Sequence, residues 1–193
     1  MKKFKLTSEF IVDISGVKLF RIKALIEFGN VKAGDLGGYI EKEENLSHMG
    51  NAWVSGNAQV SGDARVFGDA RVFGNAQVSG DAQVFGDARV FGNAWVFGDA
   101  RVSGNAQVSG DAQVFGDARV SGDKDYAYAH GFGSCNRTTT FFRLKDGDVG
   151  VRCGCFYGTL AQFRDNVCET HGETKKAQEY LMLADLMDFR FKN

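Results

Sequence analysis

The most reactive side chains of the sequence lie in its last third. Cys153 and Cys155 are two residues apart, so they would share one face of a strand, and Cys168 and His171 are three apart, as on one face of a helix. Three thiolates and an imidazole suit a tetrahedral zinc ion. The spacing matches no standard zinc motif, so buried thiols beside a helix-end histidine are the competing interpretation. We expect no cofactor, and zinc at these four residues is the alternative that the sequence leaves open.

A polar segment just before these cysteines has the composition of an anion site. Hydroxyl, amide and guanidinium groups gather near glycines, and backbone amides beside such groups suit a phosphate or another anion. A polar loop entering a strand has much the same composition. The candidate anion ligands are Ser134, Asn136, Arg137, Thr138, Thr139 and Arg143.

Catalysis has few candidates in this sequence. Cys155 and His171 could form a thiolate pair, with Arg137 nearby, but no Asn or Asp is clearly placed to orient the imidazole. The segment from Gly50 to Gly122 holds no His, Cys or Lys, so it lacks an imidazole base and a thiol or amine nucleophile. We assign no catalytic residue and favour a non-enzymatic function.

Composition narrows the class of protein further. The 193 residues carry a formal net charge of -1, which gives no electrostatic argument for nucleic acid as a partner. No run of 18 apolar residues exists, and the first residues lack an apolar signal core. We therefore expect no membrane partner and a cytoplasmic protein.

The segment between Gly50 and Gly122 is an internal repeat. Glycine recurs every six residues, and each unit reads Gly, Asn or Asp, Ala, a variable residue, Val, then Ser or Phe. An exact six-residue period is the signature of a β-helix. Val points inward from a short strand, while the Gly-Asn or Gly-Asp pair supplies a corner. Twelve units at three per triangular turn predict about four turns.

Residues 18 apart in such a coil stack in vertical columns on its outer walls. Outward aromatic side chains form patches that are large enough to need a partner, although stacked aromatics also stabilise a ladder without one. We expect these patches to mediate lateral association between copies of the chain. The candidate interface residues are Trp53, Phe67, Phe73, Phe85, Phe91, Trp95, Phe97 and Phe115.

The segments on either side of the repeat differ from it. Two strands, 4–14 and 17–28, are predicted around a Ser15-Gly16 turn, followed by an irregular coil over 30–50. After the repeat, a hairpin is predicted over 138–144 and 149–155. A helix then opens at the Thr159–Gln162 capping box, and a second runs over 174–191.

The repeat resembles the left-handed β-helix of the hexapeptide-repeat superfamily. Its lead-in, Val31-Lys-Ala-Gly-Asp-Leu-Gly-Gly-Tyr-Ile-Glu41, is similar to the opening of phage and prophage repeat proteins that are often labelled polymer-forming. The segment from Gly133 to Arg143, with Cys153-Gly-Cys-Phe156, resembles a small C-terminal module of such proteins. The resemblance covers about residues 18–122 and brings no assigned active site. It implies a mobile-element origin and trimers packed about a threefold axis.

Together these observations predict a mainly β fold with three regions. An N-terminal hairpin and capping coil (1–49) precedes a left-handed parallel β-helix of hexapeptide repeats (50–122) and a small α+β module of ββαα order (123–193). The function expected is a non-enzymatic, trimeric binding or scaffold protein of phage origin. It would display its module to a host protein or a small phosphorylated ligand and so counter host defence. The alternatives are an enzyme with a Cys/His site in the module and a structural virion or filament component.

Overall fold

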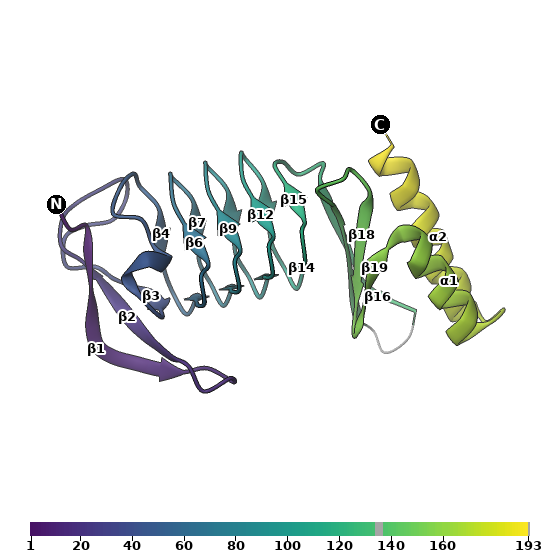
Figure 1. The fold of residues 1–193 in the computed structure, drawn as a ribbon, viewed down its shortest axis with the longest axis horizontal. Coiled ribbons are helices and arrows are strands. Elements are labelled where there is room, and N and C mark those ends of the chain that lie inside the picture. Colours follow the sequence, from purple (N-terminus) through teal and green to yellow (C-terminus); the bar gives the residue numbers. More distant parts are fainter. Residues whose placement is uncertain (134–136, 193) are drawn as a thin grey trace.

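The computed structural model describes residues 1–133 and 137–192 and shows an elongated molecule. A β-solenoid occupies the centre, a hairpin lies at one end, and a sheet covered by two helices lies at the other (Figure 1). Within the described residues, no helix is long and apolar enough to cross a membrane.

The solenoid is built from very short strands that stack into three walls. The wall we call A contains β4, β7, β10 and β13, wall B contains β5, β8, β11 and β14, and wall C contains β6, β9, β12 and β15. All neighbouring strands within these walls pair in parallel. The strands are β4 (Trp53–Val54), β5 (Gln59–Val60), β6 (Arg65–Val66), β7 (Arg71–Val72), β8 (Gln77–Val78), β9 (Gln83–Val84), β10 (Arg89–Val90), β11 (Trp95–Val96), β12 (Arg101–Val102), β13 (Gln107–Val108), β14 (Gln113–Val114) and β15 (Arg119–Val120).

The solenoid has about five turns rather than the predicted four. Strand β3 (Leu36–Ile40) pairs in parallel with β5, and Leu46 bridges to Val66, so the segment predicted to be irregular forms an additional first turn. A short 3-10 helix, Glu43–Asn45, lies between these two contacts. The prediction failed because this turn lacks the six-residue glycine period of the others.

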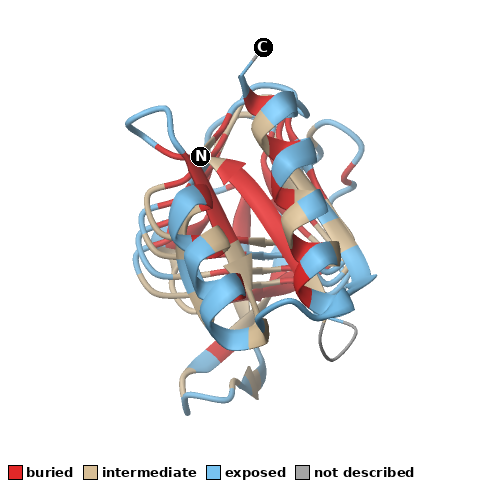
Figure 2. Ribbon diagram, turned by 90° about the vertical axis from the view of Figure 1, so that its right-hand side faces the viewer, coloured by how far each residue is buried: buried red, intermediate tan, exposed pale blue. Residues whose placement is uncertain are grey.

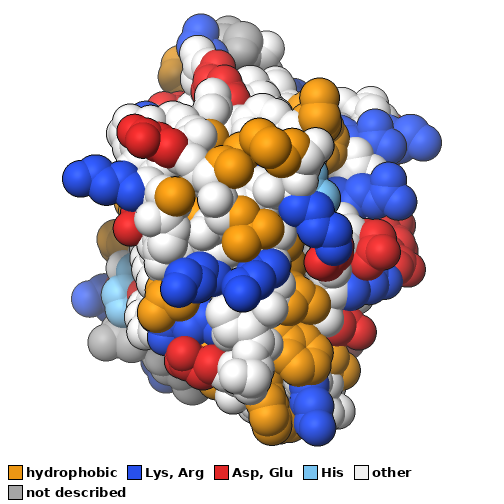
Figure 3. Space-filling model, turned by 90° about the vertical axis from the view of Figure 1, so that its left-hand side faces the viewer, with side chains coloured by type: hydrophobic (Ala, Val, Ile, Leu, Met, Phe, Trp, Pro, Cys, Tyr) orange, Lys and Arg blue, Asp and Glu red, His pale blue; other side chains and the backbone are white. Residues whose placement is uncertain are grey.

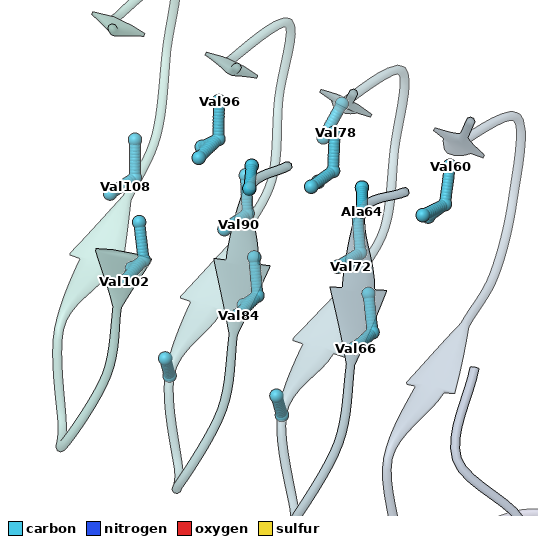
Figure 4. Packing of buried hydrophobic residues seen from close by; sticks show 14 of the residues in the cluster. Val60, Ala64, Val66, Val72, Val78, Val84, Val90, Val96, Val102 and Val108 are labelled. Carbon is cyan, nitrogen blue, oxygen red and sulfur yellow. The ribbon is translucent and has the colours of Figure 1, made fainter. Parts of the chain in front are cut away.

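The core of the solenoid is a set of aligned Val and Ala columns. Figure 4 shows Val60, Val78 and Val96 in one row, with parallel rows from the other two walls. The inward Val and Ala side chains of all twelve repeat units are at most 1% exposed. Alternation along each two-residue strand explains this, since it sends Val inward and the residue before it outward.

The backbone hydrogen bonds at the strand ends and corners of the solenoid run in one direction between coils. There, each coil donates N–H groups to carbonyls of the following coil, as from Trp53 to Ala70 (3.0 Å) and from Arg89 to Ala106 (2.9 Å), while the parallel pairing within the strands also uses bonds in the reverse direction. A side-chain ladder at one corner repeats this direction: Asn57, Asn75 and Asn93 donate in turn, and Asp111 accepts the last bond. One end of the coil therefore presents mainly carbonyls and the other presents mainly N–H groups.

The N-terminal cap supplies donors to the carbonyl end. Strands β1 (Phe4–Val12) and β2 (Lys18–Ala24) form the predicted hairpin, which extends the sheet of wall B through β3. The Lys3 ammonium donates to the Ala52 carbonyl (2.8 Å) and the Gly50 carbonyl (3.3 Å). The buried Asn45 amide donates to Gly62 (3.0 Å) and Ala64 (2.9 Å). Figure 3, which looks onto this end, shows it covered by side chains, with hydrophobic groups interspersed among Lys and Arg.

The C-terminal module supplies acceptors to the N–H end. Its antiparallel sheet has the order β16 (Tyr126–Phe132), β17 (Arg137–Arg143), β18 (Val149–Cys153) and β19 (Phe156–Thr159). The Gln113 N–H donates to the Thr140 hydroxyl (2.9 Å), and the Gln107 N–H donates to the Asp123 carboxylate (3.0 Å). Phe142 and Tyr126 join the hydrophobic core of the solenoid.

Two helices cover the outer face of this sheet (Figure 2). Helix α1 (Leu160–His171) starts at the predicted capping box, in which the Gln162 N–H donates to the Thr159 hydroxyl (3.3 Å). Helix α2 (Lys175–Phe191) starts at Thr174. The module is thus ββββαα rather than ββαα, and its sheet is the lid of the solenoid.

The corner glycines offer a direct test of the stacking. Gly80 has a φ of +70°, and a Cβ atom there would lie 3.0 Å from the Gly98 nitrogen of the next coil. We expect Gly80→Ala to lower the free energy of unfolding in urea by about 1–3 kcal/mol. The matched control is Gly122→Ala, where no atom lies within 4 Å of the added methyl group, and this variant should unfold like the wild type. Equal effects of the two changes would contradict the stacking.

A second prediction concerns Lys3, which is 1% exposed. Burial lowers its pKa from 10.5 to about 8, opposed in part by the Asp69 carboxylate. Because the folded-state pKa is the lower one, the unfolded chain binds more protons between these values, so the contribution of Lys3 to stability grows as pH rises. The stability difference between the wild type and Lys3→Met should widen by about 1 kcal/mol from pH 7 to pH 9 in urea unfolding. A difference that stays constant with pH would refute this assignment.

Candidate functional site

The predicted cysteine and histidine residues meet at a cavity in the C-terminal module. The cavity has a volume of about 430 Å³ and lies between the ends of β17, β18 and β19 and the two helices. Its lining combines thiols, aromatic rings and a few polar groups: Arg137, Cys153, Cys155, Phe156, Phe163, Asn166, Val167, Thr170, His171 and Tyr180.

The floor of the cavity is aromatic. The Phe163 ring packs against the Phe156 ring (5.5 Å between centroids) and the Tyr180 ring (5.7 Å), and His171 stacks on Tyr180 at 5.8 Å. Residues 163, 167 and 171 follow at intervals of four, so one face of α1 carries them all toward the sheet. The capping box at Thr159 fixes where the helix begins and therefore which face turns inward.

The mouth of the cavity holds the single guanidinium group of the lining. A Cβ atom at Gly154, which has a φ of +59°, would lie 2.2 Å from Arg137 Nη1, so the guanidinium lies against the turn between the two thiols. The half-buried Cys153 sulfur accepts a hydrogen bond from Thr139 Oγ1 (3.2 Å) and donates to the Tyr180 hydroxyl (3.8 Å). Cys155 is exposed. The two thiols therefore differ in environment although they are only two residues apart.

The predicted zinc site is not assembled. Cys168 is exposed and does not line the cavity, because it lies about 60° around α1 from His171. Within residues 1–133 and 137–192, no three His, Cys, Asp or Glu side chains lie close enough to hold a metal ion. Sequence spacing placed the two residues on one helical face, but the sheet contacts only the part of that face that carries His171.

The predicted anion ligands are separated by the structure, and Ser134 and Asn136 lie outside the described residues. Thr139 is buried against Cys153, while Thr138 Oγ1 lies 2.9 Å from His130 Nδ1 on the opposite face of the sheet. Arg143 stands six residues from Arg137, or about 20 Å along a strand. Its guanidinium donates to the Phe191 carbonyl (2.8 Å) at the end of α2. Of the described residues in the set, Arg137 alone lines the cavity.

The predicted aromatic columns form, but two of their members pack against the segments that close the ends of the solenoid. Trp53 is 5% exposed because Phe28 (5.4 Å) and Phe4 (6.5 Å) of the N-terminal cap cover it, so it is not an outward residue. Phe115 packs against Tyr157 of the module (4.6 Å), and Arg152 lies over its ring. Burial at this contact raises the pKa of the Tyr157 hydroxyl.

Two aromatic pairs remain on the sides of the solenoid. Phe67 and Phe85 stack on wall C, and Phe73 and Phe91 stack on wall A, each pair with 4.9 Å between nearly parallel rings. All four rings are half-buried. Trp95 on wall B is 38% exposed and lies 6.5 Å from Phe97, which in turn contacts Phe115.

The comparisons with known proteins support the central fold. The family model described as YdcK β-solenoid repeat matches residues 58–74, 64–80, 82–98 and 96–110, all of which lie in the stacked strands. The chain is a β-solenoid repeat protein. These matches do not reach the N-terminal hairpin or the C-terminal module, and no curated protein matches the chain.

The exposure of the thiols gives a prediction for their reactivity. Iodoacetamide should alkylate the exposed Cys155 and Cys168 before it alkylates the half-buried, hydrogen-bonded Cys153. Peptide mass spectrometry at successive times would resolve the sites, and the urea-unfolded chain is the control in which the difference should vanish. Faster modification of Cys153 would contradict the arrangement described above.

Proposed function

We propose that this chain is a non-enzymatic binding protein built on a left-handed β-helix of the hexapeptide-repeat type. In this proposal, three copies associate side by side, and each presents the cavity of its C-terminal module to a small anionic ligand. The observation that carries the proposal is that both ends of the solenoid are closed while stacked Phe pairs remain on two of its sides.

The closed ends favour lateral contacts over filament growth. Addition of a copy to either end would require the free carbonyl or N–H groups of a terminal coil. Lys3 and Asn45 bind the carbonyls at one end, and Thr140 and Asp123 bind the N–H groups at the other. The alternative of a filament or virion component, which would grow through its ends, is therefore the weaker one.

The two remaining Phe pairs favour a closed ring of copies. A ring forms through heterologous contacts, so each copy needs two different contact surfaces. Walls A and C each carry one stacked pair, and they meet at the corner that bears Asp69 and Asp87. Wall A of one copy could thus pack against wall C of the next. The triangular section of the solenoid suits three copies.

The biological setting of this proposal rests on resemblance. The lead-in from Val31 to Glu41 is similar to that of phage and prophage repeat proteins. A phage protein that presents a ligand cavity in several copies would gain avidity for its target. Sequestration of a host signal or capture of a host protein would then counter host defence inside the bacterial cytoplasm.

One observation favours a second candidate function, which is catalysis in the module. Cys155 and His171 line the same cavity as Arg137. A thiol nucleophile, a base and a cation are the groups that an acyl-transfer or hydrolytic site would use. If an activity is found, Cys155→Ser should abolish it and leave the number of subunits unchanged.

The aromatic walls provide the test of self-association. Serine occupies the same column as Phe73 and Phe91 at Ser55 and Ser109, so the double variant Phe73→Ser, Phe91→Ser keeps a side chain that the coil accommodates. We expect native mass spectrometry to show three copies of the 21.1 kDa chain for the wild type and one copy for this variant.

The matched control for this experiment is Gln59→Ser with Gln77→Ser on wall B, which should leave the assembly intact. Circular dichroism would show that every variant keeps its strands. A monomeric wild type, or a double Phe variant that assembles like the wild type, would overturn the proposal.

A further inference from the structure

The charged groups of the module cavity indicate the sign of the charge that its ligand would carry. Among the described residues that line it, Arg137 has the only permanent charge, and no Asp or Glu side chain faces the interior. The nearby Glu179 carboxylate accepts a hydrogen bond from the Gly133 N–H (2.8 Å) and is not part of the lining. A guanidinium without an opposing carboxylate favours an anion, for which it offers paired N–H donors.

The aromatic floor of the cavity favours a ligand whose main part is flat and apolar. Phe163 and Tyr180 are buried and meet edge to face, and Phe156 and His171 extend the aromatic surface on either side. Such rings pack best against another flat apolar group, because offset and edge contacts add to the burial of apolar surface. The volume of about 430 Å³ lies at the small end of the range for ligand pockets.

The polar groups of the lining gather at the rim. Asn166 and Thr170 are exposed and lie four residues apart on α1, so they occupy the same side of the helix. Arg137 is also exposed and reaches the cavity from the start of β17. An apolar floor below a polar, cationic rim is suited to a molecule with one flat apolar end and one acidic end.

We propose that this cavity binds a small planar aromatic acid of one or two rings. Its acidic group pairs with the Arg137 guanidinium and accepts hydrogen bonds from Asn166 and Thr170. Its rings lie on the surface formed by Phe156, Phe163 and Tyr180. This inference rests on the proposed binding function and narrows the ligand from any small anion to one chemical class.

Three probes with the same rings separate the charge from the aromatic body. Naphthalene-2-carboxylate, 2-naphthalenemethanol and 2-naphthylmethylammonium differ only in the group that would face Arg137. We expect isothermal titration calorimetry to show the carboxylate binding about tenfold more tightly than the alcohol, with the ammonium ion binding most weakly.

Variants of the rim assign that preference to Arg137. Arg137→Gln should weaken carboxylate binding about tenfold, to the affinity of the alcohol, and leave alcohol binding unchanged. The matched control is Arg164→Gln, because Arg164 lies on the same helix as Asn166 but pairs with Asp185 (2.8 Å) outside the cavity. Asn166→Trp changes an exposed helix position and should block all three probes by filling the mouth.

Alkylation of the cysteines locates the bound probe. Saturating naphthalene-2-carboxylate should slow the reaction of Cys155 with iodoacetamide, since Cys155 lines the cavity, and should leave the exposed Cys168 unaffected. Equal affinity for carboxylate and alcohol, unchanged binding in Arg137→Gln, or equal protection of both cysteines would each overturn the inference.

Native mass spectra of the same samples separate this inference from the proposed assembly. A monomer that binds the carboxylate through Arg137 would overturn the proposed trimer and support the proposed class of ligand. A trimer that shows no preference for the carboxylate would support the proposed assembly and overturn the proposed class of ligand.

Discussion

The need to pair the backbone groups at both ends of the stacked coil is the constraint on which the remaining structure depends. In a closed bundle or barrel, the backbone groups of each element find partners within that unit. A stacked coil instead leaves unpaired backbone groups at both ends, mainly carbonyls at one and mainly N–H groups at the other, and both ends also expose the apolar Val and Ala columns. Unpaired backbone groups beside an apolar core are costly and promote aggregation. The two flanking segments are therefore chemically different because the two ends that they close are different.

This constraint explains residue choices that composition alone leaves obscure. A buried lysine is rare in proteins, yet Lys3 is accommodated because its ammonium donates hydrogen bonds to two backbone carbonyls at the start of the repeat. Tyr126 has the complementary position at the far end, where its hydroxyl donates to the Gln107 carbonyl and burial raises its pKa. The Asn ladder ends in Asp111 because the Asn93 amide needs an acceptor. The Asp111 carboxylate has no N–H group of its own, so the ladder can stop there.

The sequence allowed the solenoid to be predicted more completely than the site. Exact six-residue spacing specifies strands, corners and inward residues at once, so the Val and Ala core and the stacked Phe pairs were confirmed. The helix starts were also predictable, because the Thr159–Gln162 box is a local signal. Strands β16 and β19 were missed: β16 contains three small residues, Ala127, Ala129 and Gly131, that are uncommon in strands, and β19 begins after the two-residue turn at Gly154.

Long-range packing determines which of the predicted site residues come together. Nothing in the local pattern shows that β17 turns Phe142 toward the solenoid and Phe141 toward the helices. That alternation places Arg137 at the cavity and carries Thr138 to the opposite face, which divided the predicted anion set. The exposure of Cys168 likewise depends on how α1 is rotated against the sheet, which sequence spacing alone does not give. The two helices and the sheet together make the cavity, so no single segment of the sequence reveals it.

The threefold section of the solenoid couples chain length to the direction in which the cavity faces. Each six-residue unit advances the chain by one wall, so the gain or loss of a single unit during evolution would rotate the lid and its helices by a third of a turn relative to the N-terminal hairpin. Only changes of 18 residues would alter the length of the molecule and leave the angular position of the cavity unchanged. Homologues with whole-coil differences in length would therefore preserve the relative placement of cap and cavity, whereas those that differ by one or two units would not.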